Sequence, residues 1–284
     1  MSAVLVTVNV LRPEAVATAG RAIDWLAAAG HAVRLPAEEA EALDRSDLVG
    51  DEHQLAEGAS LAVSLGGDGT MLRTVALTAT AEVPILGVNH GALGYLTEVE
   101  PTDLDAALER FFAGGHHIER RMLLEVRVER SGEPPVRHLA LNEAVLEKTF
   151  SGHTVRLDVA IDGTPFTPYE TDGLIVATPT GSTAYAFSAR GPIVSPTHRL
   201  VLLTPVSPHM LFDRTLVLEP DGAVRLAVAG HRSAALAVDG RPLGHLGPGD
   251  AIVCGAAAEQ VHLVVFERRD FPGLLKAKFK LSDR

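Results

Sequence analysis

Residues 61–77 read LAVSLGGDGTMLRTVAL, and they predict a buried strand, a glycine-rich turn and a helix in direct succession. Such a turn presents backbone N–H groups to an anion at the start of the helix. Gly66, Gly67 and Gly69 let the backbone approach phosphate oxygens, because glycine carries no Cβ. A carboxylate at Asp68 is repelled by phosphates unless it accepts a proton or shares a magnesium ion. The stretch favours phosphoryl transfer, although glycine and aspartate are also common in ordinary loops.

The composition limits the possible classes of protein. The 284 residues are 46% hydrophobic and 21% charged, which allows one large domain or two ordinary domains. A net charge of −11 argues against a nucleic-acid or anionic membrane surface, since both require clustered Lys and Arg. The single cysteine, Cys254, excludes an internal disulfide and a cysteine-based zinc site. The start lacks a signal-peptide pattern, and no apolar run approaches the ~18 residues of a membrane span. We therefore expect a soluble, cytoplasmic protein.

Strand-like and helix-like segments alternate in the first hundred residues. Apolar runs at 3–8 and 84–88 predict further strands buried on both faces. Apolar residues at helical spacing predict a helix from about 16 to 27. Thr102 with Asp105 resembles a capping box at the start of another helix. This alternation predicts a doubly wound α/β domain, which we assign to residues 1–117.

The pattern changes near residue 118. From there, apolar and polar residues alternate, as in 122–129 and 155–161, and Asp-Gly pairs mark turns between such runs. Helical windows are few, apart from one at about 181–190. The second half therefore predicts a β-sandwich domain, which we assign to residues 118–267.

Residues 178–185, TPTGSTAY, concentrate hydroxyl groups between a predicted strand and a predicted helix. Ser182 or Thr183 could simply cap that helix. Alternatively, the hydroxyls and exposed amides hold a polar ligand such as a nucleotide, with Tyr185 as a flat face for a ring.

Two further sites combine polar residues with predicted strands. Asn142-Glu143 interrupts an apolar segment. The pair is either a solvated turn or bulge, or part of a ligand site. In such a site the Asn142 amide would read a base edge and the Glu143 carboxylate would accept from ribose hydroxyls. Asp172 precedes one predicted strand and Asp239 ends another, and each alone is most simply a turn residue. No histidine metal pattern, serine-hydrolase elbow or Walker-type loop is present.

Taken in order along the chain, these motifs resemble those of the NAD kinase family. The resemblance runs from about residue 60 to about 245 and includes 87–95, GVNHGALGY. The GGDGT element alone is shared with 6-phosphofructokinases and diacylglycerol-type lipid kinases. The Asn-Glu pair together with TPTGSTAY is much more specific to NAD kinases.

The resemblance implies an enzyme that phosphorylates the 2′-hydroxyl of the adenosine ribose of NAD, giving NADP. The donor would be ATP or polyphosphate with Mg²⁺ or another divalent metal, and we expect a strict metal requirement because local cations are few. The family fold implies a C-terminal tail, about 268–284, that returns to the first domain. It also implies a homo-oligomer, a dimer or tetramer, with NAD and the phosphate donor as ligands.

The family motifs also assign roles to individual residues. Asp68 would be the catalytic carboxylate, which orients the ribose hydroxyl and accepts its proton late in the reaction. No residue is assigned to bind a metal directly. The residues assigned to donor or dinucleotide binding are Gly66, Gly67, Gly69, Thr70, Arg73, Asn142, Glu143, Asp172, Thr180, Ser182, Thr183, Ala184, Tyr185 and Asp239.

Five positions depart from the common family pattern. His90 and Ala92 stand where many members have leucine and arginine, and Tyr95 stands where phenylalanine is usual. Glu170 stands where a basic residue is often found, and Arg190 replaces a common glycine. Glu170 bears on donor-phosphate handling, because it reverses the sign of a nearby charge.

Two other functions stay open. A related lipid or sugar-phosphate kinase would share the glycine-rich turn, but the Asn142-Glu143 pair argues against it. A non-catalytic dinucleotide sensor would bind NAD or NADPH without forming product, and the intact Asp68 argues against that function.

Overall fold

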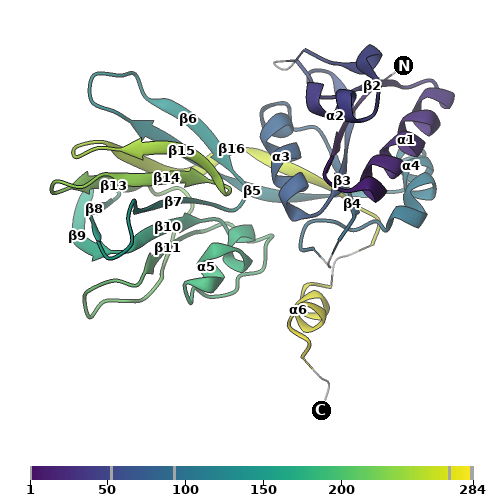
Figure 1. Cartoon of the computed structure of the whole chain (residues 1–284). Helices are drawn as coiled ribbons and strands as arrows, with labels where there is room; N and C mark the ends of the chain where they lie inside the picture. Colours follow the sequence, from purple (N-terminus) through teal and green to yellow (C-terminus); the bar gives the residue numbers. More distant parts are fainter. Residues whose placement is uncertain (1, 52–53, 92–93, 268–269, 282–284) are drawn as a thin grey trace. The chain divides into compact units, whose positions relative to one another are not determined.

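The computed structural model describes residues 2–51, 54–91, 94–267 and 270–281, and the chain forms two compact units (Figure 1). Unit 1 comprises residues 1–120 and 261–284, and unit 2 comprises residues 121–260. Strands β5 (His117–Glu129) and β16 (Ala251–Val265) contribute residues to both units. Each unit buries its own cluster of apolar side chains.

Unit 1 is built on a parallel sheet with the strand order β2-β1-β3-β4, and the end of β16 lies beside β4. The bounds are β1 (Ala3–Val8), β2 (Ala32–Arg34), β3 (Ala59–Gly66) and β4 (Ile85–Asn89). β1, β3 and β4 are largely apolar and buried, because helices cover them on both faces. The strands predicted from the three apolar runs are thus confirmed.

Helices lie on both faces of this sheet. Their bounds are α1 (Pro13–Ala28), α2 (Ala37–Ala42), α3 (Asp68–Thr78) and α4 (Leu104–Phe112). On one face, Ile23 of α1 shares a core cluster with Val6 of β1. On the other, Thr74 Oγ1 of α3 lies 2.6 Å from Thr7 Oγ1, and adjacent strand residues point to opposite faces. Figure 1 shows α3 on the side opposite α1 and α4, which is the predicted doubly wound arrangement.

The capping box predicted at Thr102 and Asp105 is wrong. Thr102 lies inside a 3-10 turn, Pro101–Asp103, and Asp103 occupies the N-cap of α4 without a side-chain hydrogen bond. Pro101 fixes the backbone at the start of this turn, so a tighter turn precedes the α-helix.

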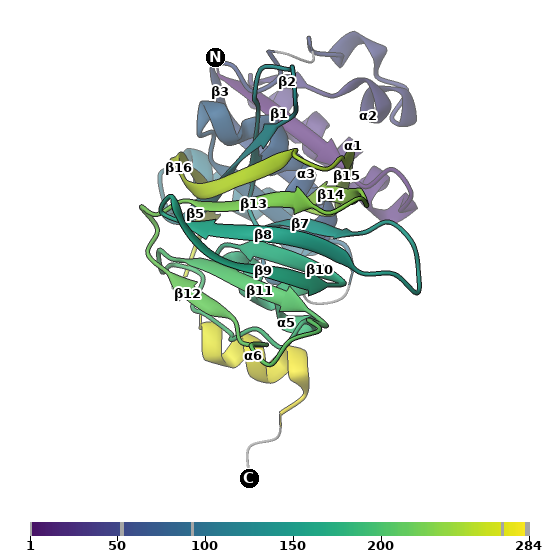
Figure 2. The ribbon, with the colours of Figure 1, turned by 90° about the vertical axis from the view of Figure 1, so that its left-hand side faces the viewer.

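Unit 2 consists of two sheets whose described strand pairings are antiparallel. One has the order β16-β13-β8-β9, with β5 paired to β16 and β6 paired to β5, and the other has the order β12-β11-β10-β7-β14-β15. Figure 2 looks onto β13, β8 and β9, which lie side by side. The bounds are β6 (Val136–Ala140), β7 (Glu143–Lys148), β8 (Val155–Ile161), β9 (Thr164–Thr171), β10 (Gly173–Ala177), β11 (Val201–Val206), β12 (Leu216–Leu218), β13 (Val224–Ala229), β14 (Ala234–Val238) and β15 (Arg241–Leu246).

The two sheets of unit 2 share one core. Leu157 of β8 and Leu174 of β10 belong to the same buried cluster, as a β-sandwich requires. Asp162-Gly163 and Asp239-Gly240 each have two positive φ angles, 52° with 75° and 48° with 74°, which suit the tight hairpin turns predicted there. Cys254 of β16 is fully buried in this core, and burial raises the pKa of its thiol.

Helix α6 (Phe271–Phe279) is assigned to unit 1 and buries no side chain. Asp270 accepts a hydrogen bond from the Gly273 N–H at its start, and the Lys278 Nζ lies 4.7 Å from the centre of the Tyr95 ring. Residues 268, 269 and 282–284 of the predicted tail lie outside the described residues.

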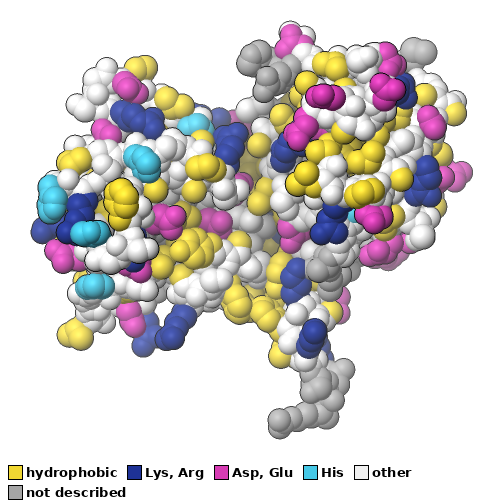
Figure 3. Space-filling model, viewed as in Figure 1, with side chains coloured by type: hydrophobic (Ala, Val, Ile, Leu, Met, Phe, Trp, Pro, Cys, Tyr) yellow, Lys and Arg dark blue, Asp and Glu magenta, His cyan; other side chains and the backbone are white. Residues whose placement is uncertain are grey.

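Surface charge and helix length are relevant to the predictions about nucleic-acid and membrane surfaces. On the face shown in Figure 3, acidic and basic side chains are interspersed. None of the helices in the described part of the chain combines the length and apolar character that crossing a bilayer demands.

Gly87 of β4 provides a test of the packing between α3 and the sheet. A Cβ at Gly87 would lie 2.9 Å from Met71 Sδ and 3.1 Å from Thr97 Cα, which is backbone and cannot rotate away. We expect Gly87→Val to lower the free energy of unfolding by about 1–3 kcal/mol through overpacking. Gly20→Ala on α1 is the control: nothing lies within 4 Å of that Cβ, so better helix propensity should raise stability slightly. Thermal melts that rank Gly87→Val equal to the unmodified chain would contradict this packing.

Candidate functional site

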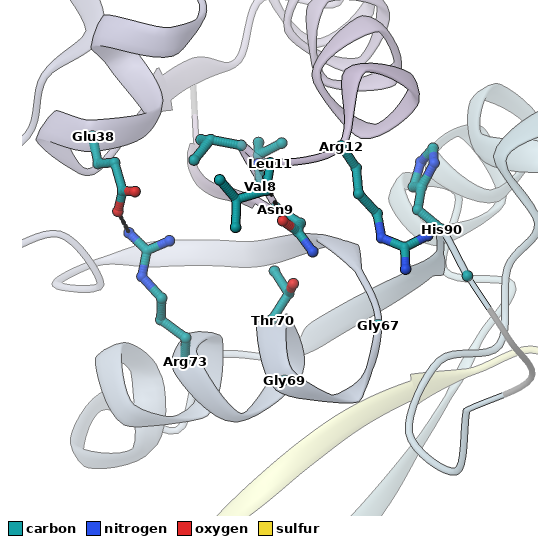
Figure 4. A pocket seen from close by; sticks show the side chains of 12 residues that line it. Val8, Asn9, Leu11, Arg12, Glu38, Gly67, Gly69, Thr70, Arg73 and His90 are labelled. Carbon is teal, nitrogen blue, oxygen red and sulfur yellow. Dashed lines mark hydrogen bonds and ion pairs between the residues drawn. The ribbon is translucent and has the colours of Figure 1, made fainter. Parts of the chain in front are cut away.

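Unit 1 contains a pocket of about 350 Å³ at the carboxyl ends of β1 and β3 (Figure 4). The chain leaves β1 towards β2 over one face and leaves β3 towards β4 over the other. Ligands of open α/β sheets bind where the connections change direction in this way. The pocket is lined by Val8, Asn9, Val10, Leu11, Arg12, Glu38, Gly67, Gly69, Thr70, Arg73, His90 and Gly91.

The predicted glycine-rich turn forms one wall of this pocket. β3 ends at Gly66, Gly67 is the N-cap of α3, and no side chain caps the N–H groups of the first turn. A Cβ at Gly66 would collide with the Thr70 side chain. At Gly67 and Gly69, in contrast, a Cβ would meet nothing within 4 Å, so both positions leave their space to the pocket. The helix N-terminus is therefore accessible to an anion.

Asp68 is held by the backbone of a neighbouring loop. Its carboxylate accepts hydrogen bonds from the N–H groups of Tyr95 at 3.1 Å and Leu96 at 3.2 Å. A Cβ at Gly94 would collide with the Asp68 carboxylate. The loop can therefore approach Asp68 this closely only because residue 94 is glycine. Ala92, in the same stretch, lies outside the described residues.

Arg73 lines the pocket, but its charge is compensated. Its guanidinium contacts both oxygens of Glu39 at 2.7 Å, and it lies 3.5 Å from Glu38 (Figure 4 shows the latter pair). The side chain of Glu39 is fully buried. Arg73 thereby ties α3 to α2.

Several residues that line the pocket were not predicted to bind a ligand, among them Arg12 and His90. Arg12 is the N-cap residue of α1, and His90 follows β4. His90 is buried, and burial is the main cause of its lowered pKa. The sequence does contain a feature that could have identified Arg12 as a pocket residue. It is a basic residue just after the first strand and just before Pro13, where a doubly wound fold places a ligand-binding loop.

In unit 2, the break between β6 and β7 is organised by Asp239. Its carboxylate accepts hydrogen bonds from the N–H groups of Leu141 and Asn142 at 2.7 Å and of Glu143 at 3.1 Å. Asn142 therefore lies at a bend between strands, and Glu143 starts β7. Asp239 itself has a left-handed φ of 48°, which follows from its place in the hairpin turn.

Glu143 is a buried carboxyl group. Burial raises its pKa to about 7, repulsion by Asp239 adds to the shift, and the backbone N–H of Tyr185 opposes it. Glu143 Oε2 has no hydrogen-bond partner among the described residues. This carboxyl group is therefore suited to change its protonation near neutral pH or when a ligand binds.

The TPTGSTAY segment packs on this bend. A Cβ at Gly181 would collide with the Asn142 backbone, and the Thr178 hydroxyl donates to the Leu141 carbonyl. Thr180 is buried, and its hydroxyl accepts from Arg121 at 3.3 Å. Asn142, Glu143 and the segment thus form one cluster within unit 2.

The segment at about 181–190 is helical, as predicted, but it is shorter and divided into two parts. A 3-10 turn, Thr180–Thr183, is followed by a single helical turn, α5 (Tyr185–Ser188), with Ala184 at its N-cap. Neither hydroxyl residue caps it, because Ser182 instead exchanges hydrogen bonds with the backbone of Val194, and the Thr183 hydroxyl donates to Thr180. The Tyr185 side chain stays 37% exposed, so one face remains accessible.

Asp172 precedes β10 and pairs with Lys148 Nζ at 2.7 Å, a partner that the sequence reasoning missed. Burial is the main cause of the raised pKa of Tyr185, and the negative charges of Glu147, Asp172 and Glu143 add to it. Glu170 is exposed on β9. Arg190 has φ 64°, a left-handed conformation in which glycine is unstrained.

Comparisons with known proteins agree along the whole chain. The model of the “ATP-NAD kinase N-terminal domain” matches residues 4–116, and that of the “ATP-NAD kinase C-terminal domain” matches residues 141–266. NAD kinase of Heliobacterium modesticaldum is 41% identical over 281 residues, which are 99% of each chain. NAD kinase 2 of Streptomyces coelicolor is 38% identical over 275 residues, covering 95% of this chain and 91% of the relative.

Solved structures are similar as well. Yeast NADH kinase in complex with NADH superposes with a TM-score of 0.92 at 26% identity, covering 100% of this chain and 89% of the yeast chain. An Archaeoglobus fulgidus NAD kinase in complex with ATP shares the fold, with a TM-score of 0.75, 24% identity and coverage of 98% and 99%. Together with the motifs and the fold, these matches establish that the chain belongs to the NAD kinase family.

Proposed function

We propose that this member of the NAD kinase family transfers the γ-phosphoryl group of ATP to the 2′-hydroxyl of the adenosine ribose of NAD, giving NADP and ADP. The observation that carries this proposal is the pocket of unit 1, where the open N-terminus of α3 and two glycines face space large enough for a phosphate chain. The family membership supports the assignment of NAD as acceptor.

On the donor side, Gly66, Gly67, Gly69 and Thr70 would hold the phosphate chain by their backbone N–H groups. Arg73 would border the phosphate chain from the next helical turn, with its charge largely compensated by Glu38 and Glu39. The described residues include no cluster of three or more His, Cys, Asp or Glu that could hold a metal ion. A divalent metal such as Mg²⁺ would accompany the donor and would supply positive charge that neutralises the phosphates during transfer.

On the acceptor side, the cluster of unit 2 would hold NAD. The Asn142 amide can donate and accept at a base edge or carboxamide, and Glu143 or Asp172 can bind ribose hydroxyls. Tyr185 offers a face for ring stacking. Asp239 would act by positioning the 141–143 backbone, since its carboxylate already accepts three N–H groups. The remaining contacts come from the turn residues Thr180, Ser182, Thr183 and Ala184.

Asp68 would be the catalytic carboxylate. It orients the 2′-hydroxyl and accepts its proton as the new phosphorus–oxygen bond forms and the bond to ADP breaks. The Tyr95 and Leu96 N–H groups fix the carboxylate in one orientation, which favours catalysis by positioning.

The proposal also covers domain organisation and assembly. We assign donor binding to residues 1–117 and NAD binding to residues 118–267, with a tail at 268–284. We further propose that the protein is a cytoplasmic homo-oligomer, dimeric or tetrameric, and that polyphosphate is a second possible donor.

The activity is tested directly with purified protein, NAD and Mg²⁺, with ATP compared against polyphosphate and NADP as the readout. We expect NADP with ATP, and none after complete chelation, because the donor phosphates need a neutralising cation. Turnover with diacylglycerol or fructose 6-phosphate but not with NAD would favour the lipid or sugar-phosphate kinase. NAD binding without NADP would favour the dinucleotide sensor.

Substitution of Asp68 tests the proposed proton acceptor. Asp68→Asn keeps the size of the side chain but cannot take the proton, so we expect kcat to fall by a factor of about 10² to 10⁴. The KM for NAD should stay within a few-fold. Asp105→Asn, at an exposed carboxylate on α4, is the control and should leave kcat unchanged. Full activity of Asp68→Asn in initial-rate assays would refute the role.

Glu143 gives the ligand-free protein a predicted pH dependence. Its carboxyl group titrates near 4.5 when unfolded and at about 7 when folded, so the folded state holds an extra proton between these values. Stability then falls as pH rises through this interval, by at most about 1.4 kcal/mol per pH unit. Glu143→Gln keeps the neutral shape, so its melting temperature should match that of the unmodified chain at pH 5 and exceed it at pH 8. Glu133→Gln, at an exposed loop, is the control, and an equal difference at both pH values for Glu143→Gln would overturn the argument.

A further inference from the structure

Two guanidinium groups border the pocket of unit 1, and their environments differ. Figure 4 shows Arg73 and Arg12 on opposite sides of Thr70, with the glycine-rich turn between them. Arg73 comes from α3, and Arg12 comes from the loop between β1 and α1. A polyanion in the pocket would lie between these two cations.

The guanidinium of Arg73 is already paired with carboxylates of the protein. It pairs with both oxygens of Glu39 at 2.7 Å, and the Glu39 side chain has no exposed surface. If Arg73 turned to a ligand, it would leave a buried carboxylate without its charged partner, which is strongly unfavourable. The negative charge of Glu39 and Glu38 also cancels much of the attraction that Arg73 can exert on phosphate.

The guanidinium of Arg12 is not held in this way. Within the described part of the chain, its guanidinium forms neither a hydrogen bond nor an ion pair, and Glu14 in the same helical turn does not pair with it. Its backbone, in contrast, is fixed. The Arg12 N–H donates to the Asn9 carbonyl at 3.0 Å, the Leu11 N–H donates to Asn9 Oδ1 at 3.2 Å, and Pro13 follows. A free cation therefore projects from an ordered loop.

The position of Arg12 is electrostatically unfavourable in the absence of a ligand. It is the N-cap residue of a 16-residue helix and faces the N-terminus of α3, and both helix ends carry partial positive charge. Cations are normally stabilising at the opposite end of a helix. An anion bound between the two helix starts would remove this repulsion and would pair with the guanidinium.

We propose that Arg12 is the principal side-chain cation that binds the phosphate chain of the donor, and that Arg73 mainly holds α2 against the phosphate-binding turn. This inference rests on the proposed function in so far as the pocket is the donor site. A guanidinium suits the role because its planar N–H groups bind phosphate oxygens in pairs. It also supplies a local cation that the acidic composition of the chain did not lead us to expect.

Equilibrium binding tests the proposal without turnover. Titration calorimetry would measure the Kd of ATP and of inorganic tripolyphosphate for the full chain, Arg12→Ala, Arg12→Lys and Arg45→Ala. Arg45→Ala is the matched control, since it removes one exposed positive charge that pairs with Asp47 outside the pocket. We expect Arg12→Ala to weaken both ligands by a factor on the order of 10 to 100, as lost charge-assisted hydrogen bonds would. Arg12→Lys should recover part of the affinity, and Arg45→Ala should behave as the unmodified chain.

The outcomes separate this inference from the proposed function. Donor affinity in Arg12→Ala equal to that of the unmodified chain would overturn the inference even if the chain makes NADP. Weaker tripolyphosphate binding in Arg12→Ala would support it even if the chain makes no NADP from ATP and NAD. If NADP is made, the KM for ATP should rise in Arg12→Ala while the KM for NAD stays within about threefold. A rise confined to the KM for NAD would contradict the assignment.

Discussion

The pocket of unit 1 depends on the close contact between Gly66 and Thr70, where β3 turns into α3. Because no Cβ fits at Gly66, the helix can begin directly at the end of a buried strand. The N-terminus of α3 then borders the pocket. The parallel sheet brings the end of β1 next to the same point, so the loop that carries Arg12 forms the facing wall. The site is thus a property of two neighbouring strand ends and needs few dedicated side chains.

Three carboxyl groups, of which Glu39 and Glu143 are buried, organise the pocket of unit 1 and the cluster of unit 2, and each is accommodated by different chemistry. Glu39 is neutralised by Arg73, and that ion pair ties α2 to α3, the helix that follows the glycine-rich turn. Asp239 is solvated by three backbone N–H groups, so it substitutes for the hydrogen bonds missing at the break between β6 and β7. Among the described residues, Glu143 pairs with no cation, and its Oε2 accepts no hydrogen bond. Its burial therefore favours the protonated form. Only the last is poised to respond to a ligand.

The sequence predicted features that arise from local patterns. The strand, turn and helix around Asp68 depend on residues next to one another, and the Asp-Gly hairpins depend on two residues each. Features set by distant contacts were missed. Asp239 reaches Leu141 because β14 pairs with β7, and Arg12 and Gly67 line the same pocket because β1 and β3 are neighbours. At 181–190 the helical pattern was real but weak, and the bonds of Ser182 to Val194 leave just one helical turn.

The buried Cys254 has a practical consequence for experiments on this protein. It is the single cysteine of the chain, and its thiol lies fully inside the sandwich core with a raised pKa, so little reactive thiolate is present. The natural sequence is therefore already a background for site-specific labelling. Cysteines introduced at exposed positions, one in each unit, would carry a pair of spectroscopic probes, and the distance between the probes would measure the separation of the two units with and without ligand.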